Sequence, residues 1–291
     1  MKKQIQKIIN KSEKLTLGNK QRKRIENIFA YSLLIIFSLI ILLPLIWIFL
    51  TSLKNRVQIY QIPPAWFFTP TLDNYLSIFD KYPFLKYFLN SSVVAVITTV
   101  LALSLGMLAA YSIARFNTGG NAFRLWILNS HTMPPVALLI PFFMLASTLK
   151  IRDTYFVVIM THLSFLLPFT MWMLIGFFDS IQVDMEEAAM VDGATRLEAF
   201  LYITLPIAAP GLSATGIVSF LFSWNEFIFA LVLTGNKTKT LPVATSAFLT
   251  QRGDLMGELS AAAMLMIIPV IILSIAFRNY LVKGLSLGAV K

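Results

Sequence analysis

The sequence predicts an all-α membrane protein with six transmembrane helices. Of its 291 residues, 57% are apolar and only 13% are charged, and the mean hydropathy is +0.74. A soluble domain typically carries about 25% charged residues, so this composition is typical of a chain embedded in a bilayer. A bilayer core about 30 Å thick needs roughly 20 apolar residues in a helix. Six predominantly apolar runs have that length, at residues 28–50, 92–113, 125–149, 154–178, 211–233 and 260–281.

The first run is a retained helix that orients the chain. It is too long for the core of a signal peptide, and no small-residue cleavage site follows it. Lysines and arginines crowd the segment 1–27 before it, and basic residues favour the cytoplasmic side. We expect this tail inside the cell, where it sets the orientation and touches anionic lipid rather than nucleic acid. Six spans then place the tail 282–291 inside as well.

The residue patterns of enzymes are absent from the sequence. The chain has no cysteine, which excludes disulfides, thiolate nucleophiles and cysteine-ligated metals. It lacks the phosphate loop, the zinc-binding helix and the nucleophile elbow. Its two histidines, His131 and His162, fall on different runs, and neither has a carboxylate or a histidine three or four residues further on. The sequence therefore predicts a chain that is not an enzyme and has no metal site.

The loop between the fourth and fifth runs is acidic, although inner loops usually run basic. Two residue pairs in it predict helix starts, Asp184 with Glu187 and Thr195 with Glu198, because the first side chain of each can accept from the opening backbone N–H groups. Gly193 stands between them and tolerates the positive φ of a sharp stop. We therefore expect a rigid two-helix hairpin.

The hairpin, residues 183–206, is expected to bind a partner. Its second helix has an apolar face before it meets the prolines at the entry to the fifth span; the face and the prolines are Leu197, Phe200, Leu201, Leu205, Pro206 and Pro210. The alternative is a hairpin that lies flat on the inner leaflet, but anionic lipid would repel so acidic a surface. A basic cleft on a partner protein is the favoured site.

The hairpin resembles the EAA motif of the membrane permeases of ABC importers. The matching positions are Glu187, Ala188, Ala189, Asp192, Gly193, Ala194, Phe200, Ile203, Leu205, Pro206 and Pro210. The resemblance extends over most of the chain and points to the MalG-like half of carbohydrate importers, through LDNY (72–75), NSSVVA (90–95), ARF (114–116), IPFF (140–143), WNEF (224–227) and the ending VKGLSLGAVK. The chain is similar in these places to the binding-protein-dependent transport subunits of bacterial cell membranes.

The resemblance implies a division of labour between subunits. The chain would pair with a homologous MalF-like permease subunit, above a dimer of cytoplasmic ATPases and below an extracytoplasmic sugar-binding protein. ATP and Mg²⁺ would be bound by the ATPases, and this chain would hold no cofactor. The cargo would be a di- or oligosaccharide, carried by alternating access that the ATPases drive through the hairpin.

The resemblance also implies contact residues. ATPase coupling would fall to Glu186, Glu187, Ala188, Ala189, Asp192, Gly193, Ala194 and Phe200, and a second ATPase contact to the tail residues Gly284, Gly288 and Lys291. The outer loop 234–259 would reach the binding protein through Gln251, Arg252, Gly253 and Asp254.

Glu226 is the strongest candidate for the substrate path. It is the only acid within any of the six runs. Placing an ionisable residue within a membrane span costs enough free energy to indicate a function. Its neighbours Trp224 and Asn225, with His162 and His131, complete the candidate path. Both a structural role for Glu226, in a hydrogen-bonded kink or gate, and direct sugar contact remain open.

Two prolines in the third span bear on the mechanism. Pro134 and Pro135 predict a bend in the third span, beside which the path would open.

An ion-coupled secondary transporter is the alternative reading, but it would usually show paired ionisable residues in the membrane or an inverted repeat. An intramembrane enzyme is a further alternative, which the missing nucleophile and metal patterns weaken.

Overall fold

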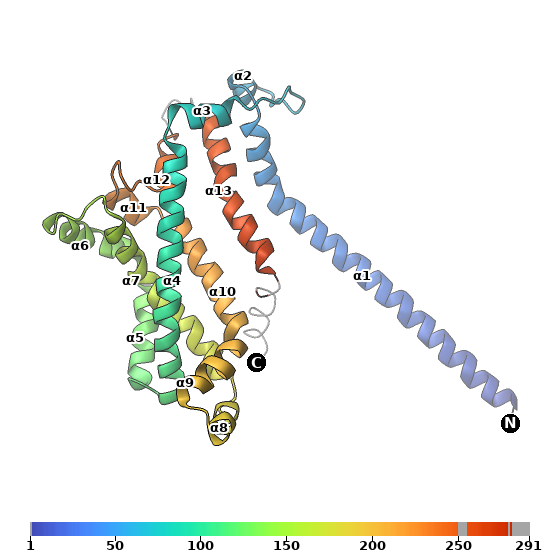
Figure 1. Cartoon of the computed structure of the whole chain (residues 1–291). Coiled ribbons are helices and arrows are strands. Elements are labelled where there is room, and N and C mark those ends of the chain that lie inside the picture. Colours follow the sequence, from blue (N-terminus) through green and yellow to red (C-terminus); the bar gives the residue numbers. More distant parts are fainter. Residues whose placement is uncertain (1, 250–254, 279, 281–291) are drawn as a thin grey trace.

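The computed structural model describes residues 2–249, 255–278 and 280, and within them the chain forms helices and no strands (Figure 1). The long helices are α1 (Lys2–Ser52), α4 (Phe84–Phe116), α7 (Tyr155–Ser180), α10 (Leu205–Trp224) and α13 (Met256–Ala276). The shorter ones are α2 (Arg56–Tyr60), α3 (Asp73–Lys81), α5 (Gly120–Thr132), α6 (Pro135–Thr148), α8 (Asp184–Val191), α9 (Arg196–Ala199), the π-helix η1 (Phe200–Thr204), α11 (Ile228–Leu233) and α12 (Leu241–Ser246).

The predicted number of spans is confirmed, with one correction. Five described helices are long and apolar enough to cross a membrane, and the pair α5 and α6 makes a sixth if it counts as one span. That pair is bent by 85°, so the run 125–149 is not a continuous helix. The bend falls where Pro134 and Pro135 predicted it, because neither proline carries an N–H for the helical ladder.

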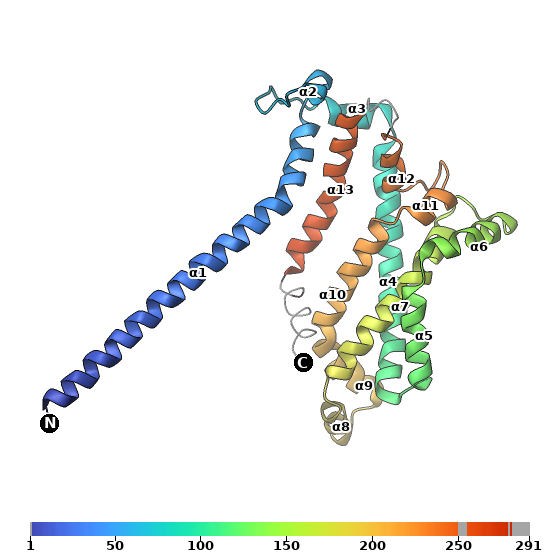
Figure 2. The same ribbon diagram turned by 180° about the vertical axis from the view of Figure 1, so that it is seen from behind.

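Helices α4, α7 and α10 pack side by side and form the core of the bundle (Figures 1 and 2). Small residues permit this close approach, as in many membrane helix pairs. A Cβ on Gly106 of α4 would lie 2.9 Å from the Thr170 methyl group of α7, and one on Gly216 of α10 would lie 2.9 Å from Leu103 of α4. Glycine at these two positions therefore sets the spacing of the core helices.

Helix α1 departs from the bundle. It is one helix from Lys2, so the segment expected as a tail continues the first span without a break. Only its C-terminal end lies beside α13, and the N-terminal part of the helix extends away from the other helices (Figures 1 and 2). None of its most apolar 18-residue window is buried within this chain.

The fifth span is displaced relative to the run 211–233. Helices α9, η1 and α10 are continuous, so the span extends over Arg196–Trp224. It ends at Trp224, and the chain turns before α11 begins at Ile228. The sixth span is shifted in the same direction, since α13 covers Met256–Ala276 rather than 260–281.

Candidate functional site

The first helix of the hairpin, α8, begins one residue earlier than a cap at Asp184 would require. Its N-cap is Val183, which makes no side-chain capping bond, so the prediction that Asp184 caps the helix is wrong. Asp184, Glu186 and Glu187 all lie in the first turn instead. Negative charge is stabilised there by the helix dipole, which explains why three acids are tolerated so close together.

The second helix start is confirmed. The Thr195 hydroxyl accepts from the Glu198 backbone N–H at 3.3 Å, and the Glu198 carboxylate accepts from the Thr195 N–H at 2.7 Å. These hydrogen bonds form a reciprocal capping box. The box fixes where α9 begins and hence the angle of the hairpin.

Gly193 makes the turn between the two helices, as predicted. Its φ is +99°, a conformation that residues with a Cβ rarely adopt. The N–H groups of Gly193 and Ala194 donate to the carbonyls of Met190 and Ala189 and close the end of α8. A Cβ on Gly193 would meet no atom within 4 Å, so the backbone conformation alone calls for glycine.

The expected apolar face of the second helix is only partly formed. Phe200 is buried, but Leu197 and Leu201 are 65% and 42% exposed. Pro206 has no N–H, and the chain widens into the π-helix η1 just before it, where Leu205 N–H reaches the carbonyl of Phe200. This wider turn changes which side chains share a face, so the helical spacing of the sequence was a poor guide.

The eight ATPase-coupling candidates divide between the surface and the interior. Glu187, Ala188, Asp192 and Gly193 are exposed, and Ala189 and Ala194 are partly exposed. Phe200 packs against the Tyr111 ring, with the ring centroids 4.4 Å apart. Glu186 is also buried. The exposed members are the ones available to a partner.

Glu186 points into its own chain. Its carboxylate lies 2.7 Å from Arg115 Nε and accepts from the Tyr111 hydroxyl at 2.8 Å. Burial opposes its charge, but the nearby Thr204 and Tyr111 hydroxyls and the Arg115 guanidinium hold the pKa of this carboxyl below its ordinary value. The structure therefore corrects the role expected for Glu186, which anchors the hairpin rather than facing a partner.

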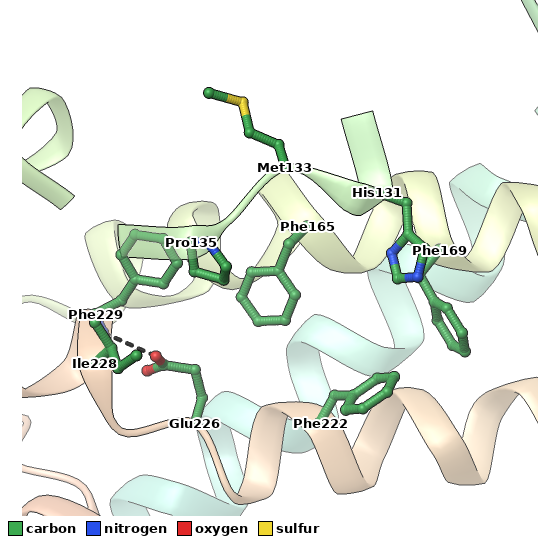
Figure 3. Close-up of a pocket in the computed structure, with 9 residues that line it drawn as sticks. All are labelled: His131, Met133, Pro135, Phe165, Phe169, Phe222, Glu226, Ile228 and Phe229. Atoms are coloured by element: carbon green, nitrogen blue, oxygen red, sulfur yellow. Dashed lines mark hydrogen bonds between the residues drawn. The ribbon is translucent and has the colours of Figure 1, made fainter. Parts of the chain in front are cut away.

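A cavity of about 240 Å³ opens beside the bend between α5 and α6 (Figure 3). It is lined by His131, Met133, Pro135, Phe165, Phe169, Phe222, Glu226, Ile228 and Phe229. Aromatic rings form most of its wall, with the Glu226 carboxylate toward one end and the His131 imidazole toward the other (Figure 3). Rings flanked by a few polar groups are typical of a pocket for a small polar molecule.

Glu226 is fully engaged with the protein. Its two carboxylate oxygens accept from the backbone N–H groups of Phe229 at 2.8 Å and Ala230 at 3.0 Å. His162 Nε2 lies 3.2 Å from the same carboxylate, and His162 Nδ1 lies 2.8 Å from the Ser223 hydroxyl. These bonds end the fifth span and begin α11, which supports the structural role for Glu226.

The remaining path candidates lie apart from the cavity. Trp224 is 1% exposed, and its indole N–H donates to the carbonyl of Met266, so it is a packing residue. Asn225 is exposed and donates to the Leu221 carbonyl at the end of α10. The structure thus brings Glu226 and His131 to one cavity, with His162 behind Glu226. The pairing of His162 with Glu226 was missed because it joins residues 64 positions apart.

Asp153 is a functional candidate that the sequence did not reveal. Its carboxylate accepts from the backbone N–H groups of Gly235 at 2.8 Å, Lys237 at 3.0 Å and Thr238 at 2.9 Å. Burial raises the pKa of this carboxyl, but the four hydrogen bonds from Lys237, Thr238 and Gly235 outweigh burial and lower it to about 2. Asp153 therefore shapes the start of the loop 234–259.

Two sets of predicted contacts lie outside the described residues. They are Gln251, Arg252, Gly253 and Asp254 in the loop 234–259, and Gly284, Gly288 and Lys291 in the tail.

Known proteins are similar to this chain in both sequence and fold. The family model for the binding-protein-dependent transport system inner membrane component matches residues 102–287. The trehalose transport system permease protein SugB of Mycobacterium tuberculosis is 38% identical over 256 residues, which cover 86% of this chain and 92% of that protein. The sulfoquinovosyl glycerol transport system permease protein SmoH of Agrobacterium fabrum is 37% identical over 253 residues, or 86% of this chain and 89% of that protein.

A solved structure agrees in fold. It is the crystal structure of a bacterial ABC transporter that imports the acidic polysaccharide alginate, and one of its chains matches with a TM-score of 0.70 and 24% identity over 88% of this chain and 96% of that one. The match extends the likeness in sequence to the arrangement of the helices. This chain belongs to the family of binding-protein-dependent transport system inner membrane components, the membrane permease subunits of ABC importers.

Proposed function

We propose that this chain is the permease subunit of an ATP-driven importer for a di- or oligosaccharide. Its membership of the permease family carries the proposal, and relatives more than a third identical are named for trehalose and sulfoquinovosyl glycerol transport. The trehalose/maltose permease protein MalG of Thermococcus litoralis is 30% identical over 88% of this chain. The ring-lined cavity suits a sugar, because the apolar faces of sugar rings pack on aromatic side chains and their hydroxyls need polar partners.

The importer would contain four kinds of component. This chain would pair with a homologous MalF-like subunit, two cytoplasmic ABC ATPases would bind and hydrolyse ATP, and an extracytoplasmic binding protein would deliver the sugar. The N-terminus and C-terminus would both lie in the cytoplasm, on the same side as the hairpin. Closure of the ATPase dimer would move the hairpin and change the membrane helices from inward-open to outward-open.

The hairpin would enter a cleft of the ATPase with Glu187 as its charged contact. Glu187 is exposed in the first turn of α8, whereas its neighbour Glu186 is buried and bonded within the chain. A carboxylate paired with a partner arginine fixes position as well as attracting, because the guanidinium fork binds both oxygens. The exposed surface around Asp192 and Gly193 would complete the contact.

Charge reversal at Glu187 tests the contact. In the complete importer, Glu187→Lys is expected to prevent co-purification of the ATPase, because it places a cation in a cleft built for an anion. Asp80→Lys makes the same change at an exposed carboxylate on α3, at the opposite end of the bundle, and is the matched control. Retention of the ATPase by Glu187→Lys would refute this role for Glu187.

Reconstitution tests the function itself. Proteoliposomes containing the permease pair and the ATPases are expected to accumulate labelled disaccharide only with ATP inside and the binding protein outside. Vesicles containing this chain alone should accumulate none under any ion gradient. Ion-driven accumulation by the single chain would instead establish the secondary-transporter alternative.

Two further contacts belong to the same proposal. Residues Gln251, Arg252, Gly253 and Asp254 would touch the binding protein, and replacing 251–257 by a Gly/Ser linker should then weaken its stimulation of ATP hydrolysis. The tail with Gly284, Gly288 and Lys291 would touch the ATPases, and deleting 284–291 should loosen the complex. Unchanged stimulation in the first case, or an unchanged complex in the second, would remove that contact from the proposal.

A further inference from the structure

One guanidinium group joins three helices at the base of the hairpin. Arg115 lies in the last turn of α4, and its Nε donates to Glu186 of α8 at 2.7 Å. Its Nη1 donates to the carbonyl of Phe178 at 2.9 Å and its Nη2 to the carbonyl of Ile181 at 3.2 Å, at the end of α7. All three nitrogens of the group are therefore used. We call Arg115, Glu186, Tyr111 and these two carbonyls the Arg115 joint.

The joint is sealed from solvent. The side chains of Arg115 and Glu186 are 5% and 6% exposed, although Glu187 beside them is open to solvent. The Tyr111 hydroxyl donates to the second oxygen of Glu186, and the rings of Phe178 and Phe200 pack around the Tyr111 ring. A buried ion pair in which both partners make further hydrogen bonds holds a defined geometry, because displacement leaves a charge unpaired in a low-dielectric interior.

The joint is placed where force would pass from the hairpin to the bundle. Residues 181–183 are all that separates α7 from α8, and Arg115 bonds to the chain at both ends of that link. It also satisfies carbonyls at the C-terminus of α7, where a cation is favoured by the helix dipole. A shift of α8 therefore pulls directly on α4 and α7, and not only on the backbone that links α7 to α8.

We propose that Arg115 is a positioning residue that couples movement of the hairpin to helices α4 and α7. It touches neither the nucleotide nor the sugar and acts through Glu186. This inference rests on the proposed function for its effect on transport, but its structural part is independent of it. With the joint broken, the hairpin still binds the ATPase through its exposed face, while its movement no longer reaches the membrane helices.

The first experiment measures the number of ATP molecules hydrolysed per sugar imported in the reconstituted importer. Arg115→Leu is expected to keep the ATPase bound and hydrolysing and to raise that ratio at least fivefold. Arg115→Lys keeps the charge but loses the fork that reaches both α7 and α8, so its ratio should fall between those of Arg115→Leu and the wild type. Arg124→Leu is the matched control, since Arg124 pairs with Asp179 on the surface nearby without touching α8, and its ratio should stay within twofold of the wild type.

A double variant covers the case in which Arg115→Leu does not fold. Arg115→Met with Glu186→Met removes both buried charges together and fills their space with apolar side chains, which proteins often tolerate. We expect this variant to fold, to bind the ATPase and to show the same raised ratio. A ratio within twofold of the wild type in the folded double variant would overturn the proposal.

The second experiment observes the hairpin in the purified full-length chain. The chain has no native cysteine, so spin labels attach only where cysteine is introduced. A label pair at Val191 of α8 and Asn121 of α5, both exposed, should give a narrow distance distribution that broadens in Arg115→Leu and in the double variant. A control pair at Val57 and Leu85, at the other end of the bundle, should not change.

The two experiments separate the two proposals. An importer that moves no sugar in its wild-type form would refute the proposed function, while the distance measurement would still decide the role of Arg115. Unbroadened distances at Val191 in both variants would refute the joint, even in an importer that transports sugar normally.

Discussion

His162 on α7 and Glu226 after α10 form a buried pair, with Nε2 3.2 Å from the carboxylate. The same carboxylate accepts from the N–H groups of Phe229 and Ala230 in the first turn of α11. It therefore supplies acceptors in place of the carbonyls of a preceding helical turn, and this stabilises the break between α10 and α11. The break in turn places Ile228 and Phe229 against the cavity.

Removal of Glu226 should weaken both stability and transport. Glu226→Ala leaves His162 Nε2 and two backbone N–H groups without their acceptor, and each buried unsatisfied group costs about 1–3 kcal/mol. We expect a lower Tm for the purified chain and at least a tenfold loss of sugar uptake. Ser164→Ala, which removes a hydroxyl bonded within α7, is the control and should change little. A wild-type Tm in Glu226→Ala would contradict the structural role.

Substitution of Gly193 should uncouple ATP hydrolysis from uptake. Gly193→Ala must place a Cβ at φ +99°, at a cost of about 1–2 kcal/mol, and Gly193→Asp adds a charge as well. Gly176→Ala is the matched control, because this glycine lies within helix α7 and its Cβ would also meet no atom within 4 Å. The measurement is ATP hydrolysed per sugar imported. Normal coupling in both Gly193 variants would show that the turn does not set the hairpin's function.

Protection of the segment 234–240 should depend on acid through Asp153. The pKa of its carboxyl is lowered from 3.8 to about 2 in the folded chain. The stability that it contributes is therefore complete above about pH 4 and is lost as the pH falls through 2. Hydrogen–deuterium exchange at Gly235, Lys237 and Thr238, divided by the intrinsic exchange rate at each pH, should speed up as the pH falls through that window in the wild type. Asp153→Asn, compared at each pH, should exchange faster at neutral pH and show no such window.

Packing of α4 against α7 should fail if Gly106 acquires a large side chain. A Cβ there would already meet the Thr170 methyl group at 2.9 Å, so Gly106→Leu must separate the helices. We expect a loss of about 1–3 kcal/mol or more, seen as a lower Tm and poor recovery from the membrane. Gly106→Ala should be milder, and Gly176→Leu on the open side of α7 should be close to neutral. A stable Gly106→Leu chain would contradict this packing.

The sequence predicted those features that depend on local chemistry. Span number follows from the length of apolar runs, the bend from two adjacent prolines, and the hairpin turn from a glycine between two acidic helix starts. The capping box at Thr195 and Glu198 was also visible, because its two members are three residues apart. Local spacing alone misplaced the cap of α8, where three acids offered more than one possible start.

Features that join distant parts of the chain could not be predicted in this way. Arg115 and Glu186 are 71 residues apart, and Asp153 and Gly235 are 82 apart. Nothing in the sequence distinguished buried Glu186 from exposed Glu187, because adjacent helical positions differ by about 100° and only the packed neighbours decide which one faces inward. The signal present was a lone arginine at the end of an apolar run, which needs a partner if it is buried.

The π-helix at Phe200–Thr204 sets the rotation of the hairpin about the axis of the span that it enters. Regular α-helix turns by about 100° per residue, so removing one residue from this wide turn would rotate α9 by about that amount around the axis of α10. The chain would keep every apolar residue of its fifth span, but a different side of its hairpin would face outward. The five-residue π-helix therefore determines the direction in which the hairpin faces as well as its connection to the fifth span.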